Sequence, residues 1–561
     1  MNITILKHVL KNSLDFDQAN SKVVLGLVLK DNPELKKDVP KLLKEIETMI
    51  KDNQLLSKEE IKDKLQELAP ELLKEKKIEI KGPLKPLPNA KKGKVIVRIA
   101  PSPSGPLHIG HAYGASLNYE YAKMYDGQLI LRIEDTNPEK IYPPAYELIE
   151  DDTKWLTDNK LAKVVIQSDR LGIYYDYAEK LVQKGYAYVC TCDPDEWRTL
   201  KNNGKTCSCR NLGEQSNRYS KMFSSYAEGE AVLRAKTNIQ HKNPAMRDFA
   251  IMRIVEHIHP RTGKEQRVWP LMVFSVAVDD HELGITHVLN GKDQMDNAEK
   301  EKAIMKSLGW QPPEYQHWGK INFDGFRLKT SEVKVAIEQK EYSGWDDIRL
   351  PFLGALRKRG YQAGAFRKFA TEIGLSLTDK NVSQLEFWKS INAFNRDIIE
   401  PKASRYFFVN EPKEIQIRNL ESKEVEISLH PNFKDRGNRK LNVSDRVYIS
   451  DKDFKTLAEG YTHRLMDLCN IEVKGNIVWK ESDHYEDYKN AENKGKIIHW
   501  VPVEENKAVE ILLDTGSILK GYGEISLQNC KEGDIIQFER FAFCRINKKE
   551  KNKIILWYLH K

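Results

Sequence analysis

Strand-like and helix-like stretches alternate between residues 93 and 190. The run Lys94–Val97 has the length and apolar character of a buried strand, and a cluster of Pro, Ser and Gly follows it. Ala115, Tyr119 and Ala122 then recur at helical spacing, before Gln128–Ile133 forms a second strand-like run. Because this alternation is typical of parallel sheets covered by helices, we predict an α/β fold for this part of the chain.

The first 90 residues carry a helical pattern rich in Lys and Glu. One face of a predicted helix is lined by Val39, Leu42, Leu43, Ile46 and Ile50. Further along, Ser57 and Glu60 have the spacing of a capping box. We predict a small helical bundle that ends at the proline-rich segment 82–88, because proline cannot continue a helix. Its role stays open between added stability and contact with RNA or a partner protein.

The last third of the chain consists of short strand-length runs between turn residues. The clearest runs are Val447–Ile449, Ile477–Trp479, Ile497–Val501 and Ile535–Phe538. Such spacing predicts one or two antiparallel β-barrels over residues 401–561. Barrels with exposed aromatic and basic side chains bind unpaired bases, and Arg464 and Arg540 are candidates for such contacts.

Composition narrows the class of protein. A chain of 561 residues is too long for one core, so we expect roughly three to five domains. Lys and Arg number 90 against 82 Asp and Glu, and the net charge of +8 suits a polyanionic partner without requiring one. No apolar run approaches the roughly 20 residues of a membrane span, and the first residues lack the pattern of a secretion signal. We therefore expect a cytoplasmic protein.

Four of the seven cysteines form two close pairs, Cys190 with Cys192 and Cys207 with Cys209. Four thiolates complete a tetrahedral zinc site and leave no position for water, so the pattern predicts a structural zinc ion rather than a catalytic one. Free buried cysteines are the alternative. The clustering also favours a reducing compartment over a disulfide framework.

Candidate phosphate-binding residues follow the first predicted strand. His108 and His111 stand near the predicted N-terminus of a helix, where imidazoles can donate hydrogen bonds to phosphate oxygens. Gly110 between them leaves room for a base or a ribose. This segment therefore has the features of a nucleotide-binding loop.

Two later strands end in polar residues. Gln128–Ile133 leads into Glu134, and the predicted strand Ile285–Leu289 leads into the turn Gly291–Asp293. Ligands of parallel α/β sheets bind beyond the carboxyl ends of the strands. We therefore expect these polar groups to share one cleft with the two histidines.

Several segments together resemble one enzyme family. The segment 98–111, RIAPSPSGPLHIGH, resembles the HIGH signature of class I aminoacyl-tRNA synthetases in its glutamyl and glutaminyl form. The segments 279–293 and 344–360 resemble two later blocks of that branch, in the same order. Barrel-like anticodon-binding domains distinguish the archaeal and eukaryal members from bacterial glutamyl enzymes. The chain therefore resembles the archaeal type of glutamyl-tRNA synthetase, whose acceptor-arm insertion carries similar Cys-x-Cys pairs that bind zinc.

The resemblance implies an ATP-dependent reaction and a role for each matching residue. His108 and His111 would stabilise the α-phosphate region of ATP during attack by the amino acid carboxylate, with assistance from Mg²⁺. Arg98 would pair with the side-chain carboxylate of the substrate, and Glu134 would hold its amino group. The substrate-binding residues implied are Arg98, Ala100, Ser102 and Glu134, and those for ATP are Gly110, Gly291, Asp293 and Lys329.

Three positions depart from the family pattern. Glu332 stands where archaeal members have the lysine of L-S-T-S-K, so we expect Lys329 of the same loop to supply the catalytic charge, with Lys334 as a second candidate. Asn290 replaces an arginine, and Met272 replaces a tyrosine that contacts substrate in some members. These departures keep open the alternative of a catalytically impaired paralogue that only binds tRNA.

The fold implied is a class I Rossmann-type catalytic domain with additions on both sides. Its parts are a helical N-terminal extension (1–90), the first half of the catalytic domain (91–185), an acceptor-arm insertion with the zinc site (186–245), the second half (246–330), a helical stem-contact region (331–400) and a β-barrel anticodon-binding domain (401–561). A relative that modifies a tRNA base is disfavoured, because such relatives lack the anticodon-binding domain.

The reaction implied is ligation of L-glutamate to the 3′ end of tRNA(Glu). It would proceed through a glutamyl-adenylate and release AMP and pyrophosphate. Use of tRNA(Gln) as a second substrate stays open, and a glutaminyl-tRNA synthetase is the alternative within the class. We expect a monomer.

Overall fold

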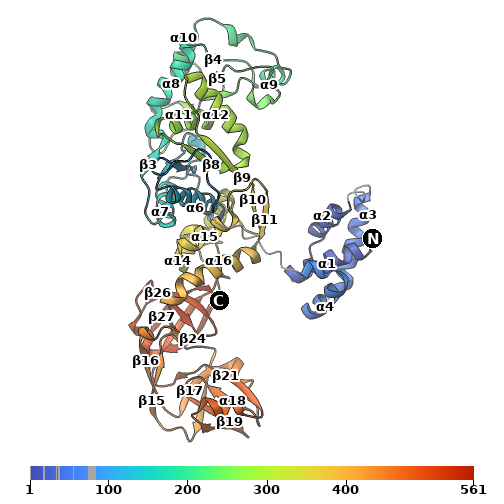
Figure 1. The fold of residues 1–561 in the computed structure, drawn as a ribbon, viewed down its shortest axis with the longest axis vertical. Helices are drawn as coiled ribbons and strands as arrows, with labels where there is room; N and C mark the ends of the chain where they lie inside the picture. The colour runs from blue at the N-terminus through green and yellow to red at the C-terminus, as the bar shows by residue number, and fades with distance from the viewer. Residues whose placement is uncertain (1, 17–18, 33–34, 36–37, 55, 74–83) are drawn as a thin grey trace. The chain divides into compact units, whose positions relative to one another are not determined.

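The computed structural model of the chain describes its residues except for 1, 17–18, 33–34, 36–37, 55 and 74–83 (Figure 1). The chain divides into two compact units, residues 1–80 and residues 81–561. The first part of the predicted proline-rich segment lies outside the described residues. Within the described ranges, no helix combines the length and the apolar character that crossing a membrane requires.

The N-terminal unit is helical, as predicted. Its helices are α1 (Asn2–Phe16), α2 (Ser21–Asp31), α3 (Val39–Asn53), α4 (Lys58–Leu68) and α5 (Pro70–Leu73). Leu42 and Ile46 of the predicted apolar face are buried, whereas the other three positions are half-buried. The capping box is confirmed, since Ser57 Oγ accepts from Glu60 N at 3.3 Å and Ser57 N donates to Glu60 Oε2 at 2.8 Å.

A parallel sheet forms the centre of the second unit. Its strands are β1 (Ile96–Ile99), β2 (Gln128–Ile133), β3 (Lys163–Ile166), β8 (His287–Gly291) and β9 (Glu314–Trp318). β1, β2 and β3 pair in parallel, as do β8 and β9. Thr286 N–H donates to the Ile96 carbonyl at 3.0 Å and joins the two groups of strands. The strand order is therefore β3-β2-β1-β8-β9, and the order reverses between β1 and β8, where ligands of such sheets bind.

Helices cover this sheet. They are α6 (Ile109–Met124), α7 (Ala145–Leu156), α8 (Leu171–Gln183), α11 (Met272–Glu282) and α12 (Met295–Leu308), with the short 3₁₀ helices η2 (Pro138–Lys140), η3 (Gln167–Arg170) and η6 (Lys292–Gln294). β2 has the predicted bounds, but β1 begins two residues later than predicted. Lys94 N–H bonds Lys91 in a turn and cannot join the strand. β8 is also shifted by two residues, because Ile285 N–H bonds the Asp280 carbonyl at the end of α11.

A second sheet is inserted between β3 and β8. Its strands β4 (Ala187–Cys190), β5 (Val232–Ala235), β6 (Ala250–Ile254) and β7 (Val268–Pro270) are antiparallel in that order. The helices α9 (Pro194–Asn202), η4 (Ser208–Asn211), α10 (Gln215–Met222) and η5 (Pro244–Met246) lie in the connections. The apolar faces of α8 and α11 pack into one core with this sheet, which places the insertion directly beside the parallel sheet.

Helices also follow β9. They are α13 (Thr330–Glu338), α14 (Leu353–Arg359), α15 (Ala363–Ile373), α16 (Gln384–Ile399) and η7 (Glu400–Lys402), with the parallel strands β10 (Ile321–Asp324) and β11 (Lys380–Ser383). Phe366, Phe369 and Ala370 of α15 belong to the same core cluster as Leu117 and Tyr121 of α6. The helical region is thereby fixed to the parallel sheet through α6.

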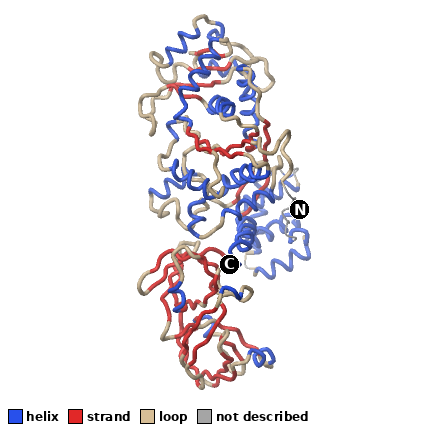
Figure 2. The backbone as a smooth tube through the Cα atoms, turned by 60° about the vertical axis from the view of Figure 1, so that its left-hand side comes forward, coloured by secondary structure: helices blue, strands red, loops and turns tan. Residues whose placement is uncertain are grey.

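Two seven-stranded sheets form the C-terminal part of the unit (Figure 2). One has the order β12-β25-β26-β27-β23-β24-β13, and the other β21-β18-β19-β20-β14-β17-β22. Their bounds are β12 (Ser404–Tyr406), β13 (Phe408–Asn410), β14 (Pro412–Arg418), β17 (Arg446–Ser450), β18 (Thr462–Leu465), β19 (Cys469–Lys474), β20 (Ile477–Ser482), β21 (Lys494–Ile498), β22 (Val501–Pro502), β23 (Asn506–Leu512), β24 (Ile518–Glu524), β25 (Ile535–Phe538), β26 (Ala542–Lys549) and β27 (Lys553–His560).

The remaining elements of this part are β15 (Lys423–Ser428), β16 (Asn438–Val443), α17 (Asp451–Phe454), α18 (Tyr485–Asn490), η8 (Lys434–Arg436) and η9 (Ile525–Asn529). Each seven-stranded sheet encloses its own apolar core. The predicted antiparallel pairing is wrong for four pairs, β12 with β25, β14 with β20, β18 with β21 and β23 with β27, which are parallel. Each of these pairs joins strands that are distant in the sequence. Local sequence patterns do not show which distant strands pair.

Candidate active site

Two histidines cap the helix that follows β1. α6 begins at Ile109, and the imidazole of His108 at the N-cap accepts a hydrogen bond from Gly110 N–H on Nδ1 at 3.0 Å. The Nδ1 atom of His111 accepts from His108 N–H at 3.2 Å, and the two ring centroids lie 3.9 Å apart. A nitrogen that accepts carries no proton, so each neutral ring has its proton on Nε2. Both rings thus keep one donor for a ligand.

The environment keeps both rings neutral. His111 keeps solvent access, although many protein atoms surround its ring. This surrounding protein lowers the pKa of His111 to about 4. Burial also lowers the pKa of His108, and the neighbouring His111 adds to the effect. Near pH 7 the pair therefore presents two N–H donors without a formal charge.

A distant segment holds the histidine loop in place. Ile109 N–H donates to the Pro351 carbonyl at 3.1 Å, and Leu353 N–H donates to the Leu107 carbonyl at 2.9 Å. The ring of Phe352 meets the ring of His108 edge-on at 5.8 Å. The start of α14 therefore fixes the position of the first histidine.

The loop before α13 touches the same segment. A Cβ atom at Gly105 would lie 2.8 Å from Cγ2 of Thr330, so only glycine allows this contact. Lys329, the residue before Thr330, is the N-cap of α13. The segment with the two histidines and the loop with the candidate lysine are therefore adjacent.

Two buried arginines and two carboxylates meet beside the ends of β1 and β2. Arg98 donates to both oxygens of Asp280, at 2.7 and 3.1 Å. Arg132 donates to Asp280 Oδ1 at 2.6 Å and to Glu134 Oε1 at 2.8 Å. Buried charges are stable when they are paired and hydrogen-bonded. The cluster therefore fixes Arg98 and Glu134 next to each other.

The two carboxyl groups of this cluster differ in their electrostatics. Burial disfavours the charged form of Asp280, but Arg98 and Arg132 outweigh it and lower the pKa of this carboxyl. For Glu134, burial prevails over the attraction of Arg132 and Arg98, and its pKa is raised. The negative charge of Glu134 is therefore less fully compensated than that of Asp280. Glu134 gains more from an additional cation, such as an ammonium group.

The other predicted substrate residues lie at the same edge of the sheet. Ala100 is half-buried directly after β1, and Ser102 is exposed two residues later. The Pro101 carbonyl between them accepts from Glu134 N–H at 2.9 Å. The ends of β1 and β2 are thereby joined, and Ala100, Ser102 and Glu134 are brought together.

The end of β8 contributes the predicted Gly-Lys-Asp turn. A Cβ atom at Gly291 would lie 2.3 Å from Asp293 Oδ1, so the carboxylate of Asp293 folds back against this glycine. Lys292 does not face a free cleft, because its Nζ bonds Asp379 at 2.7 Å. Gly291 and Asp293 therefore lie at the carboxyl end of the strand next to β1.

Sequence reasoning gave no role to several members of the buried network. Asp279 accepts from Gln167 at 3.0 Å and from Arg170 and Tyr174 at 2.7 Å each, which attaches α11 to the start of α8. Glu301 on α12 accepts from the Tyr315 hydroxyl at 3.1 Å, and burial raises the pKa of Glu301 to about 7. The sequence signal for the network was an arginine, Arg132, inside an otherwise apolar strand.

The parts of the chain that match known protein families correspond to the parts of the fold described above. Residues 94–401 match the family of class I tRNA synthetases (E and Q), catalytic domain. The chain belongs to this family. Residues 403–489 and 497–547 match its two anticodon-binding domains.

Proteins named glutamate–tRNA ligase are similar to the chain over their full length. The protein of Methanobrevibacter smithii is 42% identical over 561 residues, with 99% of each chain covered. Those of Methanocaldococcus jannaschii and Pyrococcus furiosus are each 43% identical, over 562 and 574 residues, again with 99% of each chain covered. The likeness to this class I family therefore includes the N-terminal unit, which the family's domains leave out.

The loop before α13 carries the candidate lysine, Lys329. Lys329 is highly exposed, with 78% of its side chain accessible, and its Nζ donates to Glu332 at 2.9 Å. Lys334 lies 5.6 Å from the centre of the Tyr142 ring and 4.0 Å from Glu338. The structure thus places Lys329 at the start of α13, close to the segment with Gly105, but its charge is paired with Glu332 in the first turn of this helix.

The other two departures from the family pattern have different surroundings. Asn290, where the resemblance implies an arginine, contacts His317 Nδ1 through Oδ1 at 2.6 Å. Met272 is 41% exposed at the start of α11. Asn290 is therefore held within the fold, whereas Met272 is accessible to a ligand.

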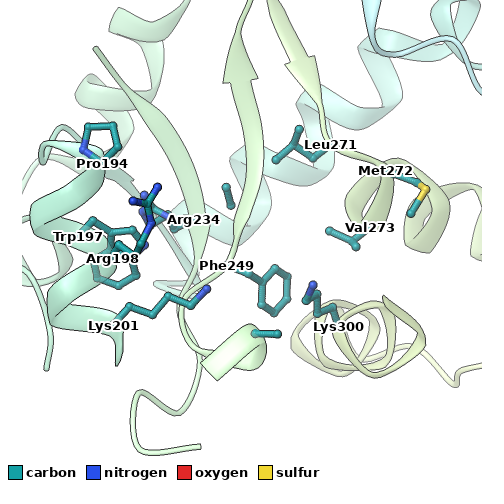
Figure 3. Close-up of a pocket in the computed structure, with 12 residues that line it drawn as sticks. Pro194, Trp197, Arg198, Lys201, Arg234, Phe249, Leu271, Met272, Val273 and Lys300 are labelled. Carbon is teal, nitrogen blue, oxygen red and sulfur yellow. The ribbon is translucent and has the colours of Figure 1, made fainter. Parts of the chain in front are cut away.

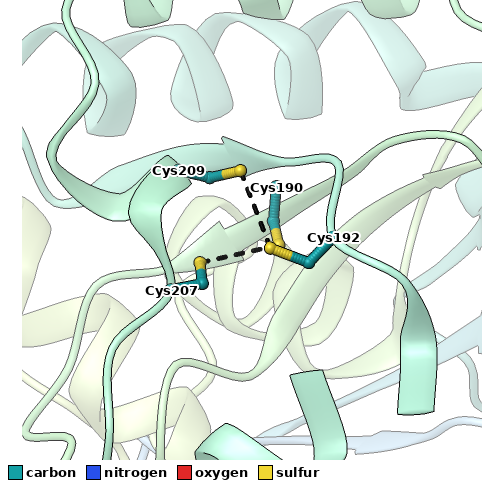
Figure 4. A group of neighbouring side chains, drawn as sticks. All are labelled: Cys190, Cys192, Cys207 and Cys209. Carbon is teal, nitrogen blue, oxygen red and sulfur yellow. Dashed lines mark hydrogen bonds between the residues drawn. The ribbon is translucent and has the colours of Figure 1, made fainter. Parts of the chain in front are cut away.

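The four clustered cysteines converge on one point (Figure 4). Cys190 ends β4 and Cys192 follows it, while Cys207 and Cys209 lie at the start of η4, and all four Sγ atoms lie within 4.8 Å of one another. The Cys190–Cys207 and Cys192–Cys209 Sγ distances are both 3.8 Å. Zinc bonds of about 2.3 Å at tetrahedral angles require about 3.8 Å between sulfurs. The cluster therefore has the donor set and the dimensions of a Cys₄ zinc site.

Proposed function

We propose that this protein ligates L-glutamate to the 3′ end of tRNA(Glu). The reaction consumes ATP, proceeds through a glutamyl-adenylate and releases AMP and pyrophosphate. The observation that carries the proposal is the pair of capping histidines at the reversal point of the parallel sheet, in a chain whose full length is similar to glutamate–tRNA ligases. We further propose that it acts in the cytoplasm, as a monomer.

The first step, formation of the glutamyl-adenylate, needs hydrogen-bond donors for the α-phosphate of ATP. It does not use a nucleophile of the enzyme. The Nε2–H groups of His108 and His111 point away from the helix backbone. They stabilise the negative charge that develops on the α-phosphate when the glutamate carboxylate attacks it. Gly110 gives the nucleotide room at the helix terminus. Gly291 and Asp293 bind the ribose side of ATP, and Lys329 binds the leaving pyrophosphate from the adjacent loop.

The amino acid binds at the ends of β1 and β2. Arg98 uses Nε and Nη2 for Asp280 and pairs with the side-chain carboxylate of glutamate through its outer edge. The incompletely compensated charge of Glu134 binds the α-ammonium group. Ala100 and Ser102 line the space between these charged groups. Because Asp280 fixes the guanidinium plane, Arg98 is positioned before the substrate arrives.

We also propose that the protein uses two metal ions, a structural zinc ion and Mg²⁺. Zinc on Cys190, Cys192, Cys207 and Cys209 would crosslink β4 to η4 and take no part in the chemistry, since four thiolates leave no open coordination site. The described residues contain no second group of three or more clustered His, Cys, Asp or Glu ligands. Mg²⁺ commonly binds through substrate phosphates, so we propose that it enters together with ATP.

The remaining parts of the chain would bind tRNA. We propose that residues 186–245 contact the acceptor arm, residues 331–400 the stem and residues 401–561 the anticodon, while residues 91–185 and 246–330 build the catalytic cleft. Arg464 is buried and donates to Asn470, and Arg540 donates to the Ile497 carbonyl, so neither side chain is free to bind a base in this conformation.

Aminoacylation with purified components tests the proposal. Each amino acid is offered separately with tRNA(Glu) or tRNA(Gln), and the charged product is separated by thin-layer chromatography. We expect glutamate charging of tRNA(Glu), and its loss when His108 and His111 are both replaced by alanine. Charging of glutamine in preference to glutamate would instead identify a glutaminyl-tRNA synthetase.

A non-catalytic tRNA-binding protein is the second candidate. The observation in its favour is the Lys329–Glu332 pair, which neutralises the only lysine of the altered motif Leu328–Glu332. Pyrophosphate exchange in the presence of glutamate and tRNA separates the two candidates. Folded protein that binds tRNA without exchange above background would support this second function.

A further inference from the structure

A buried carboxyl group lies behind the histidine loop, and none of the roles proposed above uses it. It belongs to Asp152 on α7, which is 2% exposed. This carboxyl group accepts a hydrogen bond from the backbone N–H of Leu107, the residue before His108. A Cβ atom at Gly354, in the first turn of α14, would lie 3.9 Å from Asp152 Oδ1. The carboxyl group therefore lies against both segments that fix the first histidine.

Leu107 is held through both of its backbone polar groups. Its N–H donates to Asp152, and its carbonyl accepts from Leu353 N–H at 2.9 Å. Leu107 is 1% exposed, so water cannot replace either partner. The next N–H along the chain, that of His108, donates to His111 Nδ1. Because each peptide unit is planar, a rotation at Leu107 would turn the His108 N–H and displace both rings.

The charge of Asp152 is poorly compensated. Its Oδ2 atom is buried and has no hydrogen-bond partner among the described residues. Arg357 on α14 favours the charged form, but this arginine is exposed and solvent screens it, and the neighbouring Asp151 disfavours the charge. The helices α6 and α15 and the strand β2 also pack against α7, and their described residues contribute no charge that acts on Asp152. Burial therefore prevails and raises the pKa of Asp152 to about 7.

This carboxyl group does not serve to stabilise the fold near neutral pH. Its pKa is about 7 in the folded state against an ordinary value of 3.8, so between these values only the folded state keeps the proton. The contribution of Asp152 to the free energy of unfolding therefore falls as the pH rises from about 4 to 7. A buried group whose charge costs stability is typical of a functional site.

No ligand reaches Asp152 directly, because its side chain is almost fully enclosed. It is also absent from the lining of the pocket of about 570 Å³ between the inserted sheet and the helices α11 and α12 (Figure 3). Any effect of Asp152 on the reaction must therefore pass through the residues that it holds.

We propose that Asp152 is a positioning residue for adenylate formation, whose carboxylate holds the Leu107 N–H and thereby directs the Nε2–H groups of His108 and His111 at the α-phosphate. The ionised carboxyl group holds this N–H more firmly than the protonated one, since charge-assisted hydrogen bonds are about twice as strong as neutral ones. The inference rests on the proposed function, because it concerns the same two histidines in the same reaction.

The test compares the full-length protein with Asp152→Asn in pyrophosphate exchange with glutamate and tRNA(Glu) at pH 6 and pH 8. Asparagine keeps the size and the acceptor oxygen of Asp152 but cannot ionise. At pH 8 we expect kcat of the variant to be about fivefold lower, with the KM for ATP within about twofold. At pH 6 the two rates should differ by less than about twofold, because Asp152 of the unchanged protein is then mostly protonated.

Other titrating groups do not disturb this comparison. Burial keeps the pKa of His108 well below 6.5 and that of His111 at about 4, so both rings stay neutral from pH 6 to pH 8. Burial also raises the pKa of Glu301 to about 7, but Glu301 is present in both proteins and its effect cancels in the ratio of their rates.

The melting temperature distinguishes positioning from a structural role. At pH 8 that of Asp152→Asn should be at least as high as that of the unchanged protein, because the variant no longer buries an uncompensated charge. Between pH 6 and pH 8 the unchanged protein should lose more stability than the variant. Asp151→Asn, which removes an exposed carboxylate from the next position of α7, is the matched control and should keep both its rate and its melting temperature.

Three results would overturn the inference. They are equal rates for Asp152→Asn and the unchanged protein at pH 8, an equal loss of rate at both pH values together with a lower melting temperature, and the same loss in Asp151→Asn. Exchange that is present but insensitive to Asp152→Asn rejects this inference alone. Absence of exchange by the unchanged protein at either pH rejects the proposed function, and the role of Asp152 with it.

Discussion

At the scale of single residues, two backbone hydrogen bonds decide what His108 and His111 can do. Because each Nδ1 accepts from an N–H of the helix terminus, each Nε2 keeps the proton and faces away from the cap. The surrounding protein keeps both rings neutral, with the pKa of His111 at about 4. The sequence alone indicated histidines near a helix terminus, but only the hydrogen bonds determine which nitrogen a phosphate meets.

The low pKa of His111 predicts how stability depends on pH. Its pKa is about 4 in the folded state and about 6.5 when unfolded, so between these values only the unfolded state takes up the proton. The free energy of unfolding should therefore fall as the pH is lowered from about 6.5 to 4. His111→Gln removes this group, and urea denaturation at pH 7 and pH 5 should show a smaller difference for the variant. Equal differences in both proteins would contradict the pKa assigned to His111.

The Lys329–Glu332 pair predicts an unusual gain of activity. Both side chains are at least half exposed, so their ion pair adds little to stability, but it occupies the charge that we propose for binding the leaving pyrophosphate. Glu332→Gln should raise the rate of pyrophosphate exchange severalfold, with an unchanged melting temperature. Lys329→Met should lower the rate by about a hundredfold, the usual cost of one lost stabilising group. Equal rates for Lys329→Met and the unchanged protein would show that another cation, such as Lys334, supplies the charge.

At the scale of elements, local sequence patterns correctly predicted the features that depend on interactions within one segment. The bounds of β2 and the capping box at Ser57 were predicted correctly, because an apolar run and a three-residue spacing are contained in the segment itself. The parallel pairing of β23 with β27 was not, since it joins segments about 45 residues apart. Arg359 at the end of α14 is buried and donates to the Leu559 carbonyl at 2.7 Å. The spacing of residues in the sequence does not show such long-range partners.

The cysteine cluster predicts a metal-dependent element. If zinc crosslinks β4 to η4, a strong chelator should release about one zinc ion per chain and expose the amides of β4 and η4 to hydrogen exchange, because the local fold loses its crosslink. The parallel sheet and its binding of ATP should survive. Cys207→Ser should lose the ion, whereas Cys530→Ser, whose thiol donates to Tyr406 in the C-terminal part, should retain it. Purified protein without metal and with unchanged amide protection would favour four free cysteines.

At the scale of the 81–561 unit, α14 connects the histidine loop to the C-terminal sheets. Its first residue, Leu353, donates to the Leu107 carbonyl beside the first histidine. Its last residue, Arg359, is 4% exposed and bonds the carbonyls of Tyr558 and Leu559 in β27. A displacement of β27 on tRNA binding would therefore reach His108 through one helix of seven residues.

This connection predicts that Arg359 affects catalysis without touching a substrate. Arg359→Met removes the donor to the buried Leu559 carbonyl and to the half-buried Tyr558 carbonyl of β27, and leaving a buried acceptor without its donor costs about 1–3 kcal/mol. Turnover with tRNA should fall at least tenfold because the C-terminal sheets no longer hold α14, while the affinity for ATP stays within about twofold. Arg357, two residues earlier, donates to the Asp151 carbonyl in α7 at 3.5 Å and makes no contact with β27 that the structure shows among its described residues, so Arg357→Met is the control for loss of charge on the same helix. If both variants lose activity equally, the effect comes from the charge of the helix and not from its attachment to the C-terminal sheets.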